Sequence, residues 1–277
     1  MEGHPESALA RTQRHAAALK ERWLGGSEPS LLGWLSMQDP AVAEIEVEWG
    51  YDGLIIDTEH STYEPSSLRA ALMAFRGTPC VPIVRVGGND VYQIKVALDL
   101  GAGGVLVPLV ETAEDARAAV SACLYPPEGT RGVSPRRASN YFRDTHTYVE
   151  NANRSVLVMV QIECLSAYRN LDAILDVEGV TALFIGPADL SASLGHLSQA
   201  DHPEVVSVIG DIIRRGRAAG RPVAIATGTR PASIQRWLDE GANIITAGGD
   251  RFFMECGFSA FREDMRRAGL RFGDRMP

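Results

Sequence analysis

Short apolar runs recur along the chain, and each is followed by a polar or glycine break and then by a segment with helical spacing. Such runs predict buried strands, and the segments between them predict helices. The apolarity is continuous rather than alternating, which is typical of parallel strands buried on both faces. Eight runs are predicted to be strands: Leu31–Met37, Gly53–Glu59, Cys80–Val86, Gly104–Val110, Val156–Glu163, Ala182–Pro187, Pro222–Thr227 and Asn243–Gly249.

The segments between these runs have the spacing of amphipathic helices, and several begin after Asp, Thr or Pro and end at Gly, as helix caps do. A final helix is expected over Phe253–Ala268. Eight strand–helix units in one chain predict a (β/α)8 barrel of the TIM type. An open doubly wound sheet is the alternative, but no GxGxxG motif follows the first strand to favour it.

The length of 277 residues fits one large barrel domain. We expect residues 1–28 to form a polar N-terminal extension that becomes helical near Ala16–Trp23, and residues 29–277 to form a single catalytic barrel. No linker or low-complexity segment divides the chain further.

The net charge of −8, with acids spread along the chain, argues against a nucleic-acid or anionic-membrane partner. No apolar run reaches the ~18 residues that a membrane span requires, and we expect no signal peptide. The four cysteines have neither CxxC spacing nor the density of a disulfide scaffold. These features predict a cytoplasmic protein with reduced thiols.

Polar side chains gather at the predicted carboxyl ends of the strands, where barrel enzymes carry their chemistry. They are Asp57, Glu59, His60, Arg85, Gln161, Glu163 and, after the sixth strand, Asp189. Taken singly, Asp189 could be a helix cap, Arg85 a surface ion pair and His60 an ordinary loop histidine. Unrelated residues of these kinds need not meet at one end of a barrel, so their convergence favours an active site.

Glu163 and Asp189 are hard oxygen donors without a nearby thiolate or His-x-x-His pair, which favours Mg²⁺, Mn²⁺ or a similar ion over structural zinc. Such an ion can hold the carboxylate and ketone oxygens of a 2-oxo acid and act as a Lewis acid. Arg85 can then donate to the developing oxyanion. His60 can serve as general base, with Asp57 or Glu59 beside it.

Two other mechanisms are disfavoured by the positions of the nucleophiles. The only lysines are Lys20, before the first strand, and Lys95, in a predicted helix, so neither suits a Schiff base at a strand end. Cys164 follows Glu163 directly, and that negative charge opposes formation of a thiolate.

The longest irregular segment is Tyr125–Phe142, and a loop of this length in a compact barrel is more often functional than idle. Its Arg136 and Arg137 could attract an acidic acceptor molecule, or they could form a solvated charge pair.

Five segments carry a resemblance to a known family: GYDGLIIDTEHS, PIVRVGGNDVYQIKVALDLGAGGVLVPLVETAEDA, YPPEGTRGVSP, VMVQIE and LDVEGVTALFIGPADLSASLG. Together they resemble the HpcH/HpaI family of metal-dependent, class II pyruvate aldolases, which includes 4-hydroxy-2-oxoheptanedioate aldolase. The likeness extends roughly from Leu31 to Gly249.

The resemblance implies a barrel of the phosphoenolpyruvate/pyruvate-binding kind whose last helix is exchanged between protomers of a homotrimer or homohexamer. It implies Mg²⁺, Mn²⁺ or Co²⁺ as cofactor, and a 2-oxo acid (pyruvate or oxaloacetate) and an aldehyde as small-molecule partners. The catalytic and metal-binding roles fall on His60 as base, Asp57 as its orienting partner, Arg85 on the pyruvyl oxygen, and Glu163 and Asp189 as metal ligands. Substrate contacts fall on Gln161, Trp34 and the backbone N–H groups of Ala188 and Asp189, and Asp99 would approach the histidine from an adjacent subunit.

The chain departs from the family at Thr58, where glycine is common, and in the segment SPRRASNYF. These departures concern the acceptor and the assembly and leave the metal and pyruvate chemistry intact. The leading hypothesis is an aldolase that cleaves or forms a 4-hydroxy-2-oxo acid from pyruvate and an aldehyde. The alternative is an oxaloacetate-decarboxylating, carbon–carbon bond-forming enzyme of the macrophomate synthase type. A barrel kept only for binding would be expected to lack the acidic pair, and both acids are present.

Overall fold

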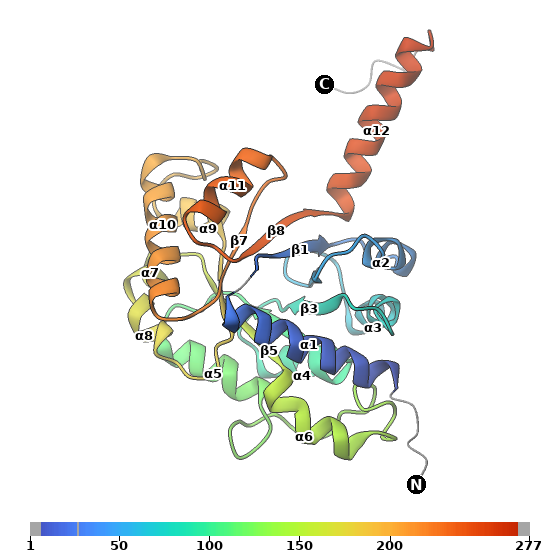
Figure 1. Ribbon diagram of the computed structural model, residues 1–277, viewed down its shortest axis with the longest axis vertical. Coiled ribbons are helices and arrows are strands. Elements are labelled where there is room, and N and C mark those ends of the chain that lie inside the picture. The colour runs from blue at the N-terminus through green and yellow to red at the C-terminus, as the bar shows by residue number, and fades with distance from the viewer. Residues whose placement is uncertain (1–6, 27, 271–277) are drawn as a thin grey trace.

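The computed structural model describes residues 7–26 and 28–270, and its centre is a closed barrel of parallel strands in the order β1 to β8 (Figure 1). Each strand pairs with the next, and β8 closes the ring against β1. The fold is a (β/α)8 barrel, as predicted. The strands are β1 Ser30–Leu35, β2 Gly53–Asp57, β3 Val81–Arg85, β4 Gly104–Val107, β5 Leu157–Ile162, β6 Ala182–Ile185, β7 Val223–Ala226 and β8 Ile244–Gly249.

Helices alternate with the strands and surround the barrel (Figure 1). They are α1 Ala8–Gly25, α2 Pro40–Val47, α3 Pro65–Ala74, α4 Val91–Asp99, α5 Ala113–Cys123, α6 Thr145–Ser155, α7 Leu165–Arg169, α8 Leu171–Leu175, α9 Pro187–Ser193, α10 Pro203–Ala218, α11 Pro231–Asp239 and α12 Asp250–Arg267. Local sequence explains several starts. The side chains of Asp39 and Asp90 accept backbone N–H groups at the first turns of α2 and α4, as N-cap residues do.

Strand side chains alternate between the interior of the barrel and the layer beneath the helices. The interior cluster includes Leu32, Ile55, Ile83, Met159 and Phe184. The intervening residues, such as Leu54, Ile56 and Val84, belong to the outer layer. Because both layers are apolar, the strands read as continuous apolar runs in the sequence.

Helix α1 closes the amino end of the barrel. Trp23 is fully buried and, with Ala16 and Leu19, belongs to the interior cluster. The helix begins earlier than predicted, at Ala8, because the Ser7 hydroxyl caps it by accepting the Ala10 N–H at 3.2 Å. The division of the chain after residue 28 stays a prediction.

The long segment Tyr125–Phe142 connects α5 to α6, a helix that the sequence pattern did not predict. This connection lies at the amino end of the strands, away from the mouth of the same barrel. Arg137 is buried there, and its guanidinium donates to the carbonyls of Leu100 and Leu72 at the ends of α4 and α3. Both roles predicted for Arg137 are therefore wrong, because it binds helix ends instead of an acceptor molecule or solvent.

Helix α12 projects away from the barrel (Figure 1). Phe253, Met254 and Phe258 on this helix are exposed. At its base, Phe253 and Met254 line an apolar groove together with Ile45 and Trp49 of the α2 region. An apolar surface of this kind is typical of a contact with another protein surface.

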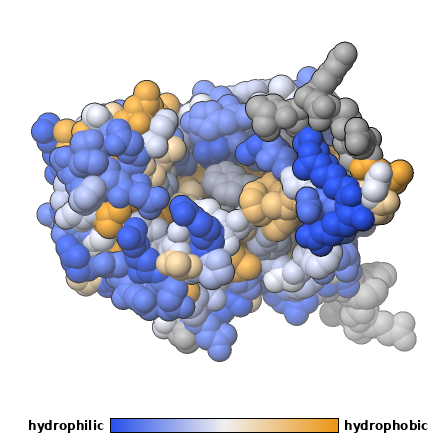
Figure 2. Space-filling model, turned by 90° about the horizontal axis from the view of Figure 1, so that it is seen from above, coloured by the Kyte–Doolittle hydropathy of each residue, from blue (hydrophilic) through white to orange (hydrophobic). Residues whose placement is uncertain are grey.

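The molecular face in Figure 2 is mostly hydrophilic, with smaller hydrophobic patches. None of the helices in the described ranges is long and apolar enough to cross a membrane. All four cysteines are free, with Cys80 and Cys123 buried and Cys256 exposed.

Candidate active site

Three of the side chains predicted at the strand ends are the last inward-facing residues of their strands. Asp57 on β2, Arg85 on β3 and Gln161 on β5 each stand two residues after a member of the interior cluster, so they point into the barrel. Trp34 on β1 packs against the same cluster. Asp57 and Arg85 are also register partners on adjacent strands. The structure therefore brings these residues together at the carboxyl end of the barrel.

The planar guanidinium group of Arg85 is held by carboxylates at its edge and by an aromatic ring against its face. Its Nε donates to Asp57 Oδ1 at 3.0 Å and its Nη2 to Oδ2 at 2.7 Å, a two-point geometry that fixes the guanidinium plane. Nη1 lies 3.3 Å from Glu59 Oε2. The Trp34 ring lies against the face, 4.5 Å from the guanidinium carbon. Two of the five guanidinium N–H groups donate to Asp57, so three remain for a substrate.

Asp57 also organises the turn that carries His60. Its Oδ1 accepts the backbone N–H groups of Glu59 at 3.1 Å and His60 at 3.2 Å. Burial would raise the pKa of Asp57, but the hydrogen bonds and charge of Arg85, with these two N–H groups, hold it below its usual range. Asp57 is therefore an ionised anchor for both Arg85 and the turn.

The His60 imidazole lies beside Glu59. Its Nε2 is 3.7 Å from Glu59 Oε2, and the His60 side chain is 61% exposed. Asp57 contacts His60 through the backbone N–H, so within one chain Asp57 positions the His60 backbone and Glu59 is the acid in ion-pair range of the ring. Burial raises the pKa of Glu59 above its ordinary value, although the charges of Arg85 and His60 oppose that shift.

Thr58 connects this turn to the neighbouring strand. Its hydroxyl donates to the Arg85 carbonyl at 2.6 Å, and its backbone N–H donates to the same oxygen at 2.9 Å. The departure noted at Thr58 thus has a structural partner, which ties the end of β2 to the strand that carries Arg85.

Glu163 and Gln161 form the other side of the site. Glu163 Oε1 accepts the Leu109 N–H at 2.8 Å, and Gln161 Nε2 donates to Glu163 Oε2. Burial raises the pKa of Glu163, these hydrogen bonds lower it, and the negative charge of Asp189 raises it, with a net rise above the ordinary value. Two carboxylates that repel each other in a partly dry site are a fitting donor set for a divalent cation.

Asp189 and Ala188 lie in the exposed first turn of α9, just after β6. The first backbone N–H groups of a helix have no partner inside the helix, so they are free to bind a ligand. Gly186 precedes them, and a Cβ at that position would come within 3.4 Å of Glu163 Oε2. The glycine therefore keeps space open beside the buried carboxylate.

Leu109 and Gly186 were missed as site residues by the sequence analysis. Leu109 has a φ of 57°, in the left-handed region, where its N–H reaches Glu163. The apolar run was expected to continue to Val110 as a strand, but β4 ends at Val107, directly before Pro108. That proline was an available sign that the chain leaves the sheet there, since proline cannot donate to a strand ladder.

Several residues singled out in the sequence lie away from this site. Asp99 is at the carboxyl end of α4, where Arg131 Nη2 donates to it at 2.7 Å, so a role for Asp99 at the mouth needs a partner chain and stays a prediction. Lys20 lies in α1 and Lys95 in α4, so neither lysine stands at a strand end. Burial raises the pKa of Cys164, which disfavours a thiolate.

Comparisons with known proteins agree with the fold and identify the family. The sequence model of the HpcH/HpaI aldolase/citrate lyase family matches residues 30–254. The chain is 40% identical over 217 residues to the 5-keto-4-deoxy-D-glucarate aldolase of Salmonella paratyphi A, which corresponds to 78% of this chain and 84% of that enzyme.

Solved structures that resemble this chain indicate the same family. An HpcH/HpaI aldolase/citrate lyase family protein from Burkholderia cenocepacia superposes with a TM-score of 0.84 at 34% identity, over 92% of this chain and all of the other (100%). The citrate synthase SbnG superposes with a TM-score of 0.80 at 29% identity, over 91% of this chain and 98% of the other. The chain therefore belongs to the HpcH/HpaI aldolase/citrate lyase family and is a carbon–carbon lyase.

Proposed function

We propose that this enzyme is a divalent-metal-dependent aldolase that cleaves or forms a 4-hydroxy-2-oxo acid, with pyruvate as one half and an aldehyde as the other. The observation that carries the proposal is the mouth of the barrel. There, the buried carboxylate of Glu163 interacts electrostatically with the exposed carboxylate of Asp189 and with the fixed guanidinium of Arg85.

Glu163 and Asp189 would hold the cation, which is Mg²⁺, Mn²⁺ or Co²⁺ in this proposal. Their fit rests on burial, which together with the charge of Asp189 raises the pKa of Glu163, and on the space that Gly186 leaves beside it. When bound, the ion supplies a Lewis acid for the carboxylate and ketone oxygens of a 2-oxo acid. Gln161 keeps Glu163 oriented through their hydrogen bond.

Arg85 would stabilise the charge that develops on the ketone oxygen during cleavage. Asp57 fixes the guanidinium plane and Trp34 lies against its face, so the three remaining N–H groups are oriented before the substrate arrives. Donors that are fixed in advance stabilise a transition state without reorganisation, and one such donor contributes roughly 10²–10³ in rate.

His60 would act as the general base. In the cleavage direction it takes the proton of the 4-hydroxyl group, the bond between carbons 3 and 4 breaks, and that electron pair moves into the enolate of pyruvate. The aldehyde leaves, and carbon 3 takes up a proton to give pyruvate. The exposed ring of His60 can exchange its proton with solvent, and Glu59 is the nearby acid that can orient it.

A named relative supports the choice of substrate class. The related Salmonella enzyme is named for 5-keto-4-deoxy-D-glucarate, a diacid in which the ketone and a hydroxyl stand as in a 4-hydroxy-2-oxo acid. Cleavage of that compound between carbons 3 and 4, counted from the keto end, gives pyruvate and a three-carbon hydroxyaldehyde acid. We infer that this chain accepts the same class of acidic acceptor.

The test is a pyruvate-release assay with 5-keto-4-deoxy-D-glucarate. Enzyme treated with chelator and dialysed should be inactive, and Mg²⁺, Mn²⁺ or Co²⁺ should restore it. Glu163→Gln should abolish activity and the binding of Mg²⁺ and Mn²⁺ while the circular dichroism spectrum is kept, whereas the matched Glu111→Gln change of an exposed acid should keep activity and binding. Full activity of the dialysed enzyme would refute metal dependence.

A second candidate uses oxaloacetate and forms or breaks a different carbon–carbon bond. The structural neighbour that favours it is the citrate synthase SbnG, whose name denotes carbon–carbon bond formation. Oxaloacetate supplied without an aldehyde separates the two functions. Pyruvate formed faster from oxaloacetate than from the keto-deoxy diacid would favour the second candidate.

For assembly, we propose that α12 is exchanged between the protomers of a homotrimer or homohexamer. The support is the projection of this helix from its own barrel, its exposed Phe258, and the apolar groove at its base (Figure 1). In such an assembly, Asp99 of one chain would face His60 of another. We also propose a cytoplasmic location, in keeping with the four free cysteines.

A further inference from the structure

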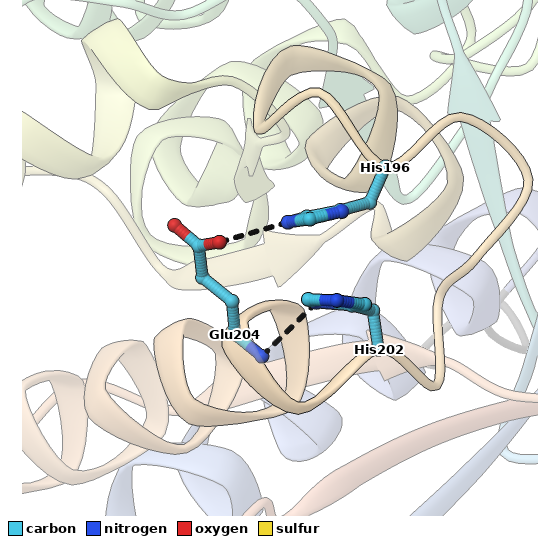
Figure 3. A group of neighbouring side chains, drawn as sticks. All are labelled: His196, His202 and Glu204. Carbon is cyan, nitrogen blue, oxygen red and sulfur yellow. Dashed lines mark hydrogen bonds and ion pairs between the residues drawn. The ribbon is translucent and has the colours of Figure 1, made fainter.

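His196, His202 and Glu204 form a compact group outside the proposed active site (Figure 3). His196 lies in the connection between α9 and α10, His202 is the N-cap of α10, and Glu204 is in the first turn of that helix. This connection follows β6, so the group stands at the carboxyl end of the barrel, on its outer side.

The three side chains converge closely. One nitrogen or oxygen from each residue can be chosen so that all three atoms lie within 4.8 Å of one another. His196 Nε2 is 2.8 Å from Glu204 Oε2, and the two imidazole rings are stacked with 3.5 Å between their centres (Figure 3). The two histidines are half-buried and Glu204 is exposed, so the group is accessible from solvent.

The backbone holds this group in place. The His196 N–H donates to the Ser191 carbonyl at 2.8 Å, and the His202 N–H donates to the Gln199 carbonyl at 2.9 Å. The residues are also close in sequence, so little chain entropy is lost when an ion bridges them. Only side-chain rotations separate the observed arrangement from one that ligates an ion.

We propose that His196, His202 and Glu204 bind a zinc-type divalent ion, at a site separate from the Glu163 and Asp189 pair. Two imidazoles and one carboxylate are a donor set that Zn²⁺ takes readily. Imidazole nitrogen favours Zn²⁺, Co²⁺ and Ni²⁺, whereas an all-carboxylate pair suits Mg²⁺ and Mn²⁺. The two sites are therefore distinguished by the chemistry of their ligands.

Binding requires the stacked rings to separate. The ion takes the place of the proton shared by His196 and Glu204, and the His202 ring turns so that one nitrogen faces the ion. This turn breaks the long hydrogen bond, 3.3 Å, from the Glu204 N–H to His202 Nδ1. Rotation of partly exposed side chains takes only picoseconds to nanoseconds, so it presents no barrier to binding.

The local charges decide how many ligands the protein supplies. A cation at the start of α10 is opposed by the positive end of the helix, and the carboxylate of Glu204 offsets that repulsion. The neighbouring Asp201 lies 3.6 Å from Arg230 and 3.7 Å from Arg236, so its carboxylate is engaged elsewhere. The protein thus offers three ligands, and water completes the coordination of the ion.

An ion held there would join the α9–α10 connection to the first turn of α10. The same connection begins at α9, whose first turn contains Asp189. We therefore expect zinc to stiffen the segment that follows a proposed catalytic ligand, without contacting the substrate itself.

Zinc binding by the full-length enzyme tests this site directly. The probe is Zn²⁺ in equilibrium dialysis, in buffer with excess Mg²⁺, and Co²⁺ absorption reports on the ligand geometry. Wild type should bind one more equivalent of Zn²⁺ than His196→Gln. His202→Gln should behave like His196→Gln, and neither change should alter the basal lyase activity.

Two control variants make the result decisive. His146 pairs with Glu150 at 3.0 Å on the exposed face of α6, and His146→Gln removes an equivalent histidine–glutamate pair without the second histidine. That variant should bind zinc like wild type. Glu163→Gln should also keep the extra equivalent. The proposal would be overturned if wild type and His196→Gln bind the same amount of Zn²⁺, or if Glu163→Gln loses the additional equivalent of Zn²⁺. Both outcomes are independent of whether the enzyme is an aldolase.

Discussion

Glu46 on α2 allows a quantitative test of the electrostatics of this fold. Its side chain is only 5% exposed, and neither carboxylate oxygen has a hydrogen-bond partner within residues 7–26 and 28–270. Burial, together with the negative charge of Asp250, raises the pKa of Glu46 from 4.5 to about 8. Asp250 is held in place by the N–H groups of Ser36 and Met37, at 2.7 and 2.6 Å.

This pKa shift fixes the direction of a pH effect on stability. The folded chain keeps the Glu46 proton up to about pH 8, whereas the unfolded chain releases it near pH 4.5. The folded state therefore binds more protons between these values, and its stability falls as the pH rises through that window. At about 1.36 kcal/mol per pKa unit, a rise from 4.5 to about 8 corresponds to about 5 kcal/mol.

Glu46→Gln replaces the carboxyl by a neutral group of the same size. We expect the two proteins to have similar stability near pH 4.5 and the glutamine variant to be more stable at pH 9, because only wild type must bury a charge or open to release it. About 5 kcal/mol corresponds to roughly 10–20 °C in melting temperature for a domain of this size. The assay is calorimetric melting from pH 4.5 to pH 9 at one protein concentration.

The exposed Glu44 on the same helix provides the control. In Glu44→Gln, the difference in melting temperature between pH 4.5 and pH 9 should be the same as in wild type. Apart from the substituted acid, each variant has the same titrating groups as wild type, and Tyr51 and Cys80, which the Glu46 charge affects, have a pKa of about 12, outside the pH range of the assay. If the curves of melting temperature against pH run parallel for wild type and Glu46→Gln, the raised pKa of Glu46 is refuted.

Three further predictions follow from single contacts. Arg85→Lys should slow pyruvate release roughly 100-fold with the fold retained, because an ammonium cannot make the two-point contact with Asp57; a rate within threefold of wild type would contradict this. Arg137→Met should lower the free energy of unfolding in urea by about 1–3 kcal/mol, since the buried Leu72 carbonyl loses its donor, and an unchanged midpoint would count against it. Phe258→Asp should lower the mass observed in sedimentation velocity, because it puts a charge on the exposed apolar face of α12; a full-sized assembly would argue against the proposed exchange.

Most of the fold could be predicted because one rule generates it. Strands covered on both faces must be apolar throughout, so each appears as a run, and the polar residue that ends the run marks the mouth. Asp57 and Arg85 were found this way, and the alternation along β2 and β3 explains why both point inward. The amino end of the chain was harder to predict. The start of α1 depends on one cap, Ser7, within a polar stretch that has little apolar periodicity.

The parts that could not be predicted depend on contacts between residues distant in sequence. Arg137 looks like any surface arginine until its partners, the Leu100 and Leu72 carbonyls, are placed next to it by the packing of α4 and α3. The acid that lies beside the His60 ring could not be predicted from the sequence either. Sequence spacing allowed either Asp57 or Glu59, and only the bond from Arg85 to Asp57 decides which carboxylate is left beside the ring.

Helix α1 has a consequence for the kinetics of the proposed reaction. Because Trp23, Leu19 and the interior cluster fill the barrel below the mouth, substrate and products enter and leave the site only through the mouth. The pyruvyl half would sit deeper, between Arg85 and the buried Glu163, and the aldehyde half nearer the exposed His60. Product release in cleavage should then be ordered, aldehyde first. Added pyruvate should inhibit competitively with the keto-deoxy diacid, and the added aldehyde should inhibit non-competitively.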